Sequence, residues 1–258
     1  MEVVSVVIPT FNCETTIRVT IESILIQSGY TTEVIVVDDG SSDISCHIVE
    51  KLCVGHNNIQ LIRLYESSGR PNVPRNIGIE RSTGDYICFL DGDDILPLNY
   101  FFWVIPLIRD KKMFVGSLKC KFRTIPPPSG FGHTRRAKGL LIPKVIQRSK
   151  NMFSMSGLIC NSSSVKSLRF SGPFLEDWRY IRRLNEIGLA GYLLYSPRIR
   201  YRVANSSLTP KSKLIQIRRV WEFFREHHSV GGAALRMPFY FLLSGVKIFF
   251  EIDLFCRP

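Results

Sequence analysis

The sequence of 258 residues has little cysteine and no long apolar run. Its seven cysteines are odd in number and include no Cys-x-x-Cys pair, so neither a zinc ribbon nor a disulfide framework is predicted. The longest apolar stretch, residues 237–250, is shorter than the roughly 20 residues of a bilayer-crossing helix, and it contains Lys247. No basic residue precedes the first apolar run, so we expect no secretory leader. These absences favour a cytoplasmic protein without a membrane span.

Acidic residues are scarce in one part of the chain and abundant in the other. Residues 1–100 hold 6 basic and 14 acidic side chains, whereas residues 101–258 hold 28 basic and 8 acidic ones. The total is a net charge of +12. An acidic pocket suits a divalent cation or a sugar, and a basic surface suits phosphate, nucleic acid or an anionic membrane.

Short β-branched runs alternate with helical patterns along the first 90 residues. Strands are predicted at residues 3–8, 33–37, 59–64 and 86–90, with helices over about 17–25, 44–52 and 73–82 between them. This alternation predicts an α/β fold with a mostly parallel sheet flanked by helices. Residues 113–122 form a further possible strand, and residues 124–139 have the composition of a loop.

Two acidic clusters follow predicted strands. Asp38 and Asp39 end one strand, and Asp91, Asp93 and Asp94 follow another. Ligands of open α/β sheets bind beyond the carboxyl ends of the strands, so we expect both clusters at one edge. Carboxylates two residues apart can share Mg²⁺ or Mn²⁺, which complete their shells with water and phosphates. Taken singly, each cluster could equally be a turn or a helix cap.

Together these segments closely resemble the nucleotide-sugar half of family 2 glycosyltransferases, which have the GT-A fold. The resemblance rests on residues 7–12 (Val-Ile-Pro-Thr-Phe-Asn), 36–43 (Val-Val-Asp-Asp-Gly-Ser-Ser-Asp), 74–78 (Pro-Arg-Asn-Ile-Gly) and 84–94 (Gly-Asp-Tyr-Ile-Cys-Phe-Leu-Asp-Gly-Asp-Asp). It implies an inverting transferase of the bacterial surface-polysaccharide type. Such an enzyme moves a sugar from a nucleoside diphosphate, usually uridine diphosphate, to an acceptor hydroxyl.

The resemblance also implies a division of the chain and a role for several residues. Residues 1–100 would form the nucleotide-sugar half of the domain, 101–205 the acceptor half, and 206–258 a basic helical extension. The residues expected to contact the nucleotide sugar are Pro9, Thr10, Asn12, Asp39, Arg75 and Asp91. Asp91 and Asp93 match the family's Asp-x-Asp metal motif, with Mn²⁺ or Mg²⁺ as cofactor, whereas Asp94 is expected to support them or to cap a helix.

The catalytic base implied by the family is an aspartate in a later Glu-Asp pair, which here is Glu176 and Asp177. Gly172 and Pro173 precede the pair and an apolar helical pattern follows, so Asp177 is expected in a first helical turn. The helix dipole there favours an ionised carboxylate. The alternative is that both acids are merely favourable first-turn charges.

The chain departs from the family pattern at two places. Many relatives carry a histidine in a Tyr-Arg-x-His-like stretch, where this sequence has Ala204, so a metal or diphosphate contact would come from Asn205, Arg202 or water, or be missing. The Gln-x-x-Arg-Trp segment of processive synthases is also absent, which favours addition of one sugar per encounter.

The basic extension predicts an amphipathic helix with one apolar stripe. The stripe consists of Leu214, Ile217, Trp221 and Phe224. A large apolar segment follows, and the whole could lie on the cytoplasmic face of a membrane, near a glycan or lipid-linked acceptor. It could instead fold back onto the core or form a dimer contact.

Two other functions fit the charge less well. A basic nucleic-acid-binding protein would need cations beside the ligand edge, which here carries aspartates, so no nucleic-acid partner is expected. A catalytically silent homologue would not need Asp39, Asp91, Asp93 and Asp177.

Overall fold

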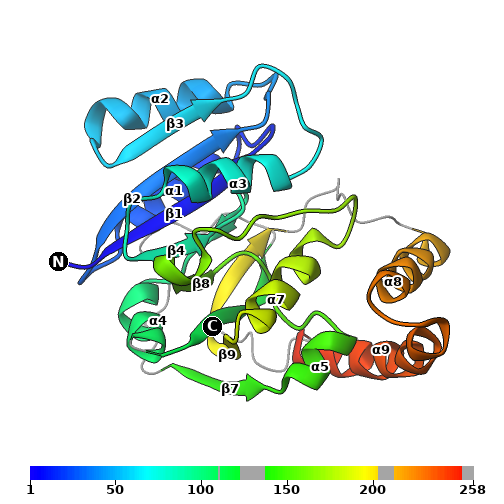
Figure 1. The fold of residues 1–258 in the computed structure, drawn as a ribbon. Coiled ribbons are helices and arrows are strands. Elements are labelled where there is room, and N and C mark those ends of the chain that lie inside the picture. Colours follow the sequence, from blue (N-terminus) through cyan, green and yellow to red (C-terminus); the bar gives the residue numbers. More distant parts are fainter. Residues whose placement is uncertain (110, 123–136, 203–211, 252–258) are drawn as a thin grey trace.

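A computed structural model describes residues 1–109, 111–122, 137–202 and 212–251 of the protein. Its centre is one mixed sheet with the strand order β3-β2-β1-β4-β8-β6-β9-β5, to which β7 adds by pairing with β9 (Figure 1). The strands are β1 (Val3–Thr10), β2 (Thr31–Asp38), β3 (Ile59–Arg63), β4 (Tyr86–Phe89), β5 (Asp94–Ile95), β6 (Met113–Phe122), β7 (Lys138–Ile142), β8 (Leu158–Asn161) and β9 (Ala190–Arg202).

The first four strands are parallel neighbours, as the alternating pattern predicts. β1 pairs in parallel with both β2 and β4, and β2 pairs in parallel with β3. Strand β8 then runs antiparallel to β4 and joins the later strands to the same sheet. The expected α/β fold is confirmed, and the carboxyl ends of β1, β2 and β4 meet at one edge.

Helices cover both faces of the sheet and bound its two main cores. They are α1 (Ile17–Leu25), α2 (Ser45–Gly55), α3 (Asn72–Arg81), α4 (Tyr100–Ile108), α5 (Lys144–Ser149), α6 (Ser162–Val165), α7 (Glu176–Glu186), α8 (Lys213–His227) and α9 (Val230–Glu251). Because alternate residues of a strand face opposite sides, β1 contributes Val6 to the core beneath α1, α2 and α4, and Val7 to the core beneath α3 and α7.

Helix α3 lies very close to β1. A Cβ atom on Gly78 would meet Val7 Cγ1 at 2.1 Å, so a larger residue at this position would push the helix off the strand. Arg75 lies one turn earlier on α3, so the close approach of Gly78 to Val7 also fixes the position of Arg75 at the sheet edge.

Helices α8 and α9 form a third, smaller core with the start of α7, at the end of the molecule opposite β3 (Figure 1). Val220, Phe223 and Phe224 are buried there around Trp178, whose ring stacks on Phe223 at a centroid distance of 4.4 Å. The extension therefore folds back onto the protein, which is the alternative that the sequence left open.

The predicted apolar stripe of α8 is confirmed in part. Phe224 is buried and Trp221 packs against the same core, whereas Leu214, at the start of the helix, is 78% exposed. Val220 and Phe223, which the stripe did not include, are also buried, because this side of the helix faces Trp178. Within the described ranges, no helix is both long and apolar enough to cross a membrane.

Candidate active site

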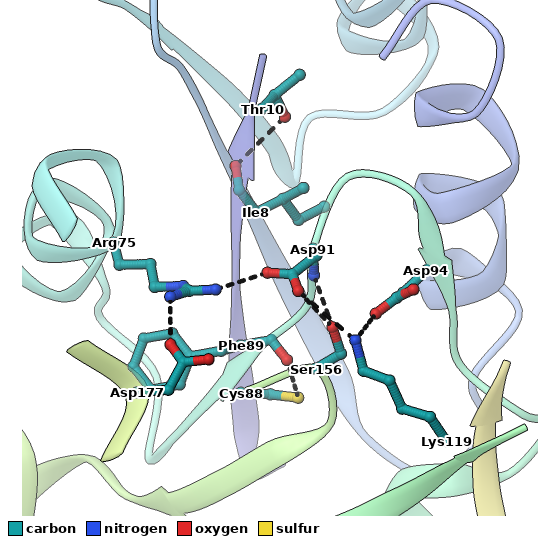
Figure 2. Close-up of polar contacts among 10 residues, drawn as sticks. All are labelled: Ile8, Thr10, Arg75, Cys88, Phe89, Asp91, Asp94, Lys119, Ser156 and Asp177. Atoms are coloured by element: carbon teal, nitrogen blue, oxygen red, sulfur yellow. Dashed lines mark hydrogen bonds and ion pairs between the residues drawn. The ribbon is translucent and has the colours of Figure 1, made fainter. Parts of the chain in front are cut away.

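The two acidic clusters meet where β1, β2 and β4 end, as expected. Thr10 and Asp38 are the last residues of paired strands β1 and β2, and Asp91 follows β4 after a single intervening buried leucine. Long-range packing then adds two groups from later segments, Ser156 and Asp177 (Figure 2).

Arg75 is the link between these groups. Its side chain is only 4% exposed, and its Nη2 and Nη1 atoms each donate a 2.8 Å hydrogen bond, to Asp91 Oδ1 and Asp177 Oδ1 respectively (Figure 2). The guanidinium also lies 5.3 Å from the ring centroid of Phe170. Burial would lower the pKa of Arg75, but Asp177 and Asp91 raise it above its usual range, so the cation is permanent.

Asp91 has both carboxylate oxygens engaged. Besides the bond from Arg75, Ser156 Oγ donates to Oδ2 at 3.0 Å, and Lys119 Nζ lies 3.8 Å from Oδ2. Burial alone would raise the pKa of Asp91, but Arg75, Lys119 and these hydrogen bonds lower it to about 2. Asp91 is thus an ionised carboxylate held between the cations of Arg75 and Lys119.

Asp93 is the second carboxylate of the predicted metal motif. Burial, with the nearby charges of Asp94 and Asp91, raises the pKa of Asp93 to about 7. A bound cation would relieve this repulsion, and diphosphate oxygens and water would complete its shell. Among the described residues no group of three or more histidine, cysteine or acidic side chains converges to hold a metal. The predicted sharing of one ion by Asp91 and Asp93 stays a prediction, and Asp91 would have to bind the ion beside its contacts with Arg75, Ser156 and Lys119.

Asp94 does not cap a helix. It is fully buried in β5, where its Oδ2 accepts a 2.7 Å hydrogen bond from Lys119 Nζ, and α4 begins later, after Asn99. Burial lowers the pKa of Lys119, but Asp94 and Asp91 raise it more, so the ammonium keeps its charge. The alternative of a supporting role beside the Asp-x-Asp motif is the one that fits.

Asp39 lies buried at the end of β2 and holds the loop that leads to α3. Ser67 Oγ and Ser68 Oγ both donate to its Oδ2 at 3.0 Å, and Ser68 N donates to Oδ1 at 2.9 Å. These bonds place the loop over the sheet edge. The predicted contact of Asp39 with the base stays a prediction, and it would use the remaining lone pairs of the same carboxylate.

Pro9, Thr10 and Asn12 line the same edge from β1. Asn12 adopts a left-handed backbone with φ of 51°; its Oδ1 accepts a hydrogen bond from Ser42 N at 2.9 Å, and its backbone N–H donates one to Ser41 Oγ at 2.9 Å. Asn12 thereby ties the end of β1 to the end of β2. Its predicted contact with the nucleotide, like those of Pro9 and Thr10, stays a prediction.

Asp177 lies in the first turn of α7, as predicted, and its side chain is 38% exposed. Burial raises the pKa of Asp177, although Arg75 lowers it. The expected preference for the ionised form at a helix start is thus outweighed by desolvation. A carboxylate with a raised pKa that keeps one solvent-facing side has the properties of a general base.

Sequence reasoning missed the residues that hold the carboxylates. Lys119 comes from β6 and Ser156 from the loop before β8, and no local pattern marks either as a partner of Asp91. Arg202 and Asn205, the predicted substitutes for the family histidine, and Ala204 in its place lie outside the residues whose side chains the structure describes.

Comparison with known proteins gives the family. The model of glycosyl transferase family 2 matches residues 5–150, more than half of the chain. Escherichia coli WfaP, named a UDP-Glc:alpha-D-GlcNAc-diphosphoundecaprenol beta-1,3-glucosyltransferase, is 34% identical over 47% of this chain and 45% of its own length. Staphylococcus aureus TarS, a poly(ribitol-phosphate) beta-N-acetylglucosaminyltransferase, is 37% identical over 36% of this chain and 16% of its own. The matches thus span less than half of these relatives.

Solved structures give the fold over nearly the whole chain. TarS residues 1–349 with UDP-GlcNAc superpose with a TM-score of 0.65 and 20% identity over 93% of this chain and 72% of that one. A Pyrobaculum calidifontis mannosyltransferase with GDP-Man and Mn²⁺ gives a TM-score of 0.61 and 18% identity over 95% and 79%. The chain has the GT-A fold of these neighbours and belongs to glycosyl transferase family 2.

Proposed function

We propose that the protein transfers one sugar from a nucleoside-diphosphate sugar, UDP-linked, to an acceptor hydroxyl with inversion at the anomeric carbon. The family match supports a sugar transferase, and the descriptions of one relative, WfaP, and one structural neighbour, TarS, name a UDP sugar. WfaP makes a beta linkage from UDP-glucose, whose glucose is alpha-linked, and this is inversion.

The observation that carries the proposal is the pair of hydrogen bonds that Arg75 donates to Asp177 and Asp91. One buried guanidinium holds Asp177, the expected base, and Asp91, the first residue of the expected donor motif, each at 2.8 Å. Segments about 100 residues apart in sequence are thereby fixed on either side of one cation. Such preorganisation is what a single displacement requires, because base and leaving group must act on opposite faces of the sugar.

In this reaction Asp177 accepts the proton of the acceptor hydroxyl as the acceptor oxygen bonds to the anomeric carbon. The bond from that carbon to the diphosphate oxygen breaks, and the electron pair leaves with the nucleoside diphosphate. Arg75 keeps Asp177 oriented, and its charge limits the rise in the pKa of this base. Asp93 would hold Mn²⁺ or Mg²⁺, which would supply Lewis-acid stabilisation of the departing diphosphate.

The test is a donor panel. Purified protein is incubated with UDP- and GDP-linked sugars and Mn²⁺ or Mg²⁺, and released nucleoside diphosphate is measured with and without extracted lipid acceptors. We expect release from a UDP sugar and an NMR spectrum of the product with the anomeric configuration opposite to that of the donor. A product of retained configuration, or no turnover of any donor, would contradict the proposal.

We further propose that the acceptor is a lipid-linked or surface glycan and that the protein meets it at the cytoplasmic face of a membrane. The names of WfaP and TarS give acceptors of both kinds for those proteins. In this chain, α9 leaves Leu235, Phe239 and Leu242 well exposed at helical spacing, next to a strongly basic region. An apolar stripe beside cations suits an anionic lipid surface.

Vesicle sedimentation tests the membrane contact. The pair of changes Leu235→Ser and Phe239→Ser should abolish binding to vesicles rich in phosphatidylglycerol, because buried apolar area drives such binding. Val54→Ser, at a 90% exposed position on α2, is the matched control and should bind like the unaltered protein. Equal binding of all three proteins would contradict the membrane proposal.

A further inference from the structure

A separate pocket lies beside Asp177. It has a volume of about 470 Å³, within the range of sites for small ligands. The loop before α3, the start of α7 and the inner faces of α8 and α9 form its walls, and Lys150 adds to the rim. Asp177 lines it, whereas Asp39, Asp91 and Asp93 do not. The pocket therefore adjoins the expected base on a side distinct from the donor motif.

Three cations line this pocket: Arg70, Lys150 and Arg219. Among the residues that the structure describes, no carboxylate forms an ion pair with Arg219. The neighbouring Arg218 pairs with Glu222 at 2.8 Å and is 80% exposed on the outer side of α8. A half-buried guanidinium that faces a pocket without an anionic partner is suited to an anionic ligand.

Aromatic rings back these cations. The Arg219 guanidinium lies 5.8 Å from the ring centroid of Phe174, and Lys150 Nζ lies 4.0 Å from that of Tyr240. Both rings line the pocket. Ring contacts hold the two charges in place and add an apolar surface on which the C–H face of a sugar can pack.

The acidic residues of the pocket are confined to the start of α7. Glu176 and Asp177 would repel an anion there, whereas Asp177 would accept a hydrogen bond from a hydroxyl. A ligand with a hydroxyl at one end and an anionic group at the other is therefore oriented by the charges of the walls. The family model does not cover α8 and α9, of which α8 supplies the cation Arg219 and α9 the ring of Tyr240.

We propose that this pocket binds the acceptor, and that the acceptor carries a phosphate ester close to the sugar or polyol that receives the new unit. Arg219 and Lys150 bind the phosphate oxygens, Phe174 and Tyr240 pack against the acceptor, and the acceptor hydroxyl points to Asp177. The inference rests on the proposed transferase function, and it makes the basic extension a specificity element for the acceptor.

Direct binding tests the proposal without turnover. Three probes are titrated calorimetrically into the protein: N-acetylglucosamine linked through a diphosphate to an alkyl chain, the same sugar linked to that chain without phosphate, and a short oligomer of ribitol phosphate. We expect a phosphate-bearing probe to bind at least about tenfold more tightly than the phosphate-free glycoside, which is a difference of about 1.4 kcal/mol. Preference for the first or the third probe tells a lipid diphosphate from a phosphodiester chain.

Variants of the arginines test whether the phosphate binds in this pocket. Arg219→Gln should weaken binding of the preferred probe at least about tenfold, Arg219→Lys should recover most of it, and Arg218→Gln should bind within about twofold of the unaltered protein. Should Arg219→Gln fail to fold by circular dichroism, Arg70→Gln gives the same test from the opposite wall. Equal binding of phosphate-bearing and phosphate-free probes, or an Arg219→Gln protein that binds normally, would overturn the proposal.

The donor panel separates this inference from the proposed function. Phosphate-dependent binding in the pocket with no turnover of any donor supports the pocket and contradicts the transferase. Turnover with acceptors that bind independently of phosphate and of Arg219 supports the transferase and contradicts the pocket.

Discussion

Arg75 and Arg219 show how differently the two regions of the molecule use the same side chain. In the acidic region, Arg75 is buried between Asp91 and Asp177, and both of its Nη atoms are committed to carboxylates. In the basic region, Arg219 is half-buried, lies over an aromatic ring and faces a pocket. A guanidinium with satisfied partners positions other groups, whereas one without an anionic partner is available to a ligand.

The largest effect on folding is expected from Arg75→Gln. It removes a buried cation shared by two partly exposed carboxylates, and because breaking a fully buried pair costs about 3–5 kcal/mol, we expect a loss near the lower end of that range. Urea unfolding measures this loss. Arg63→Gln is the control, because its 2.8 Å pair with Glu50 is half exposed and contributes less than about 1 kcal/mol. Equal losses in the two variants would show that Arg75 does not organise the site.

A second effect is expected from Asp93→Asn and depends on pH. The pKa of Asp93 is about 7 in the folded protein and lower in the unfolded chain, so the folded state binds the extra proton between about pH 4 and 7. Stability therefore falls as pH rises through that window, and above it the penalty is complete. Without metal at pH 8, Asp93→Asn should be more stable than the unaltered protein, by at most about 4 kcal/mol.

Urea unfolding in a chelator at pH 4.5 and pH 8 measures that difference. Added Mn²⁺ should then raise the Tm of the unaltered protein and leave that of Asp93→Asn unchanged, because only the former has the carboxylate that fits the ion. A Tm rise of equal size in both proteins would place the ion elsewhere.

A smaller effect is expected from Ser68→Ala. The change removes the Ser68 hydroxyl, whose proton can go to Asp39 Oδ2 at 3.0 Å or to Arg70 O at 2.8 Å, and leaves the bonds to Asp39 from Ser67 Oγ and the Ser68 backbone. A lost hydrogen bond of this kind costs about 1 kcal/mol. The double change of Ser67 and Ser68 to alanine should cost more and also weaken UDP binding, as measured by calorimetry. Unchanged UDP affinity in the double variant would separate this loop from the donor site.

The same contrast between regions explains what the sequence could predict. Strands such as Val3–Thr10 and Thr31–Asp38 were predictable because β-branched runs end at turn residues, and the parallel order follows from their alternation with helices. The convergence of Asp39, Asp91 and Asp93 follows from that order alone.

Other features depend on tertiary contacts that no local pattern encodes. Lys119 on β6 reaches Asp94 on β5 because both strands pair with β9, and this pairing joins segments that are distant in sequence. Periodicity identified Phe224 of α8, which is buried, but not Val220 and Phe223, which are buried because they lie in the small core around Trp178. The raised pKa of Asp177 arises from burial, which a sequence does not display.

The most direct test of the central claim, that Asp177 is the base facing the acceptor, is Asp177→Asn assayed for UDP binding and for transfer on the same preparation. We expect UDP affinity within about twofold of the unaltered protein and transfer reduced about 10²- to 10⁴-fold, the usual contribution of a general base. Glu186→Gln, near the exposed end of the same helix, is the control and should transfer normally. Turnover of Asp177→Asn at the rate of the unaltered protein would contradict the claim.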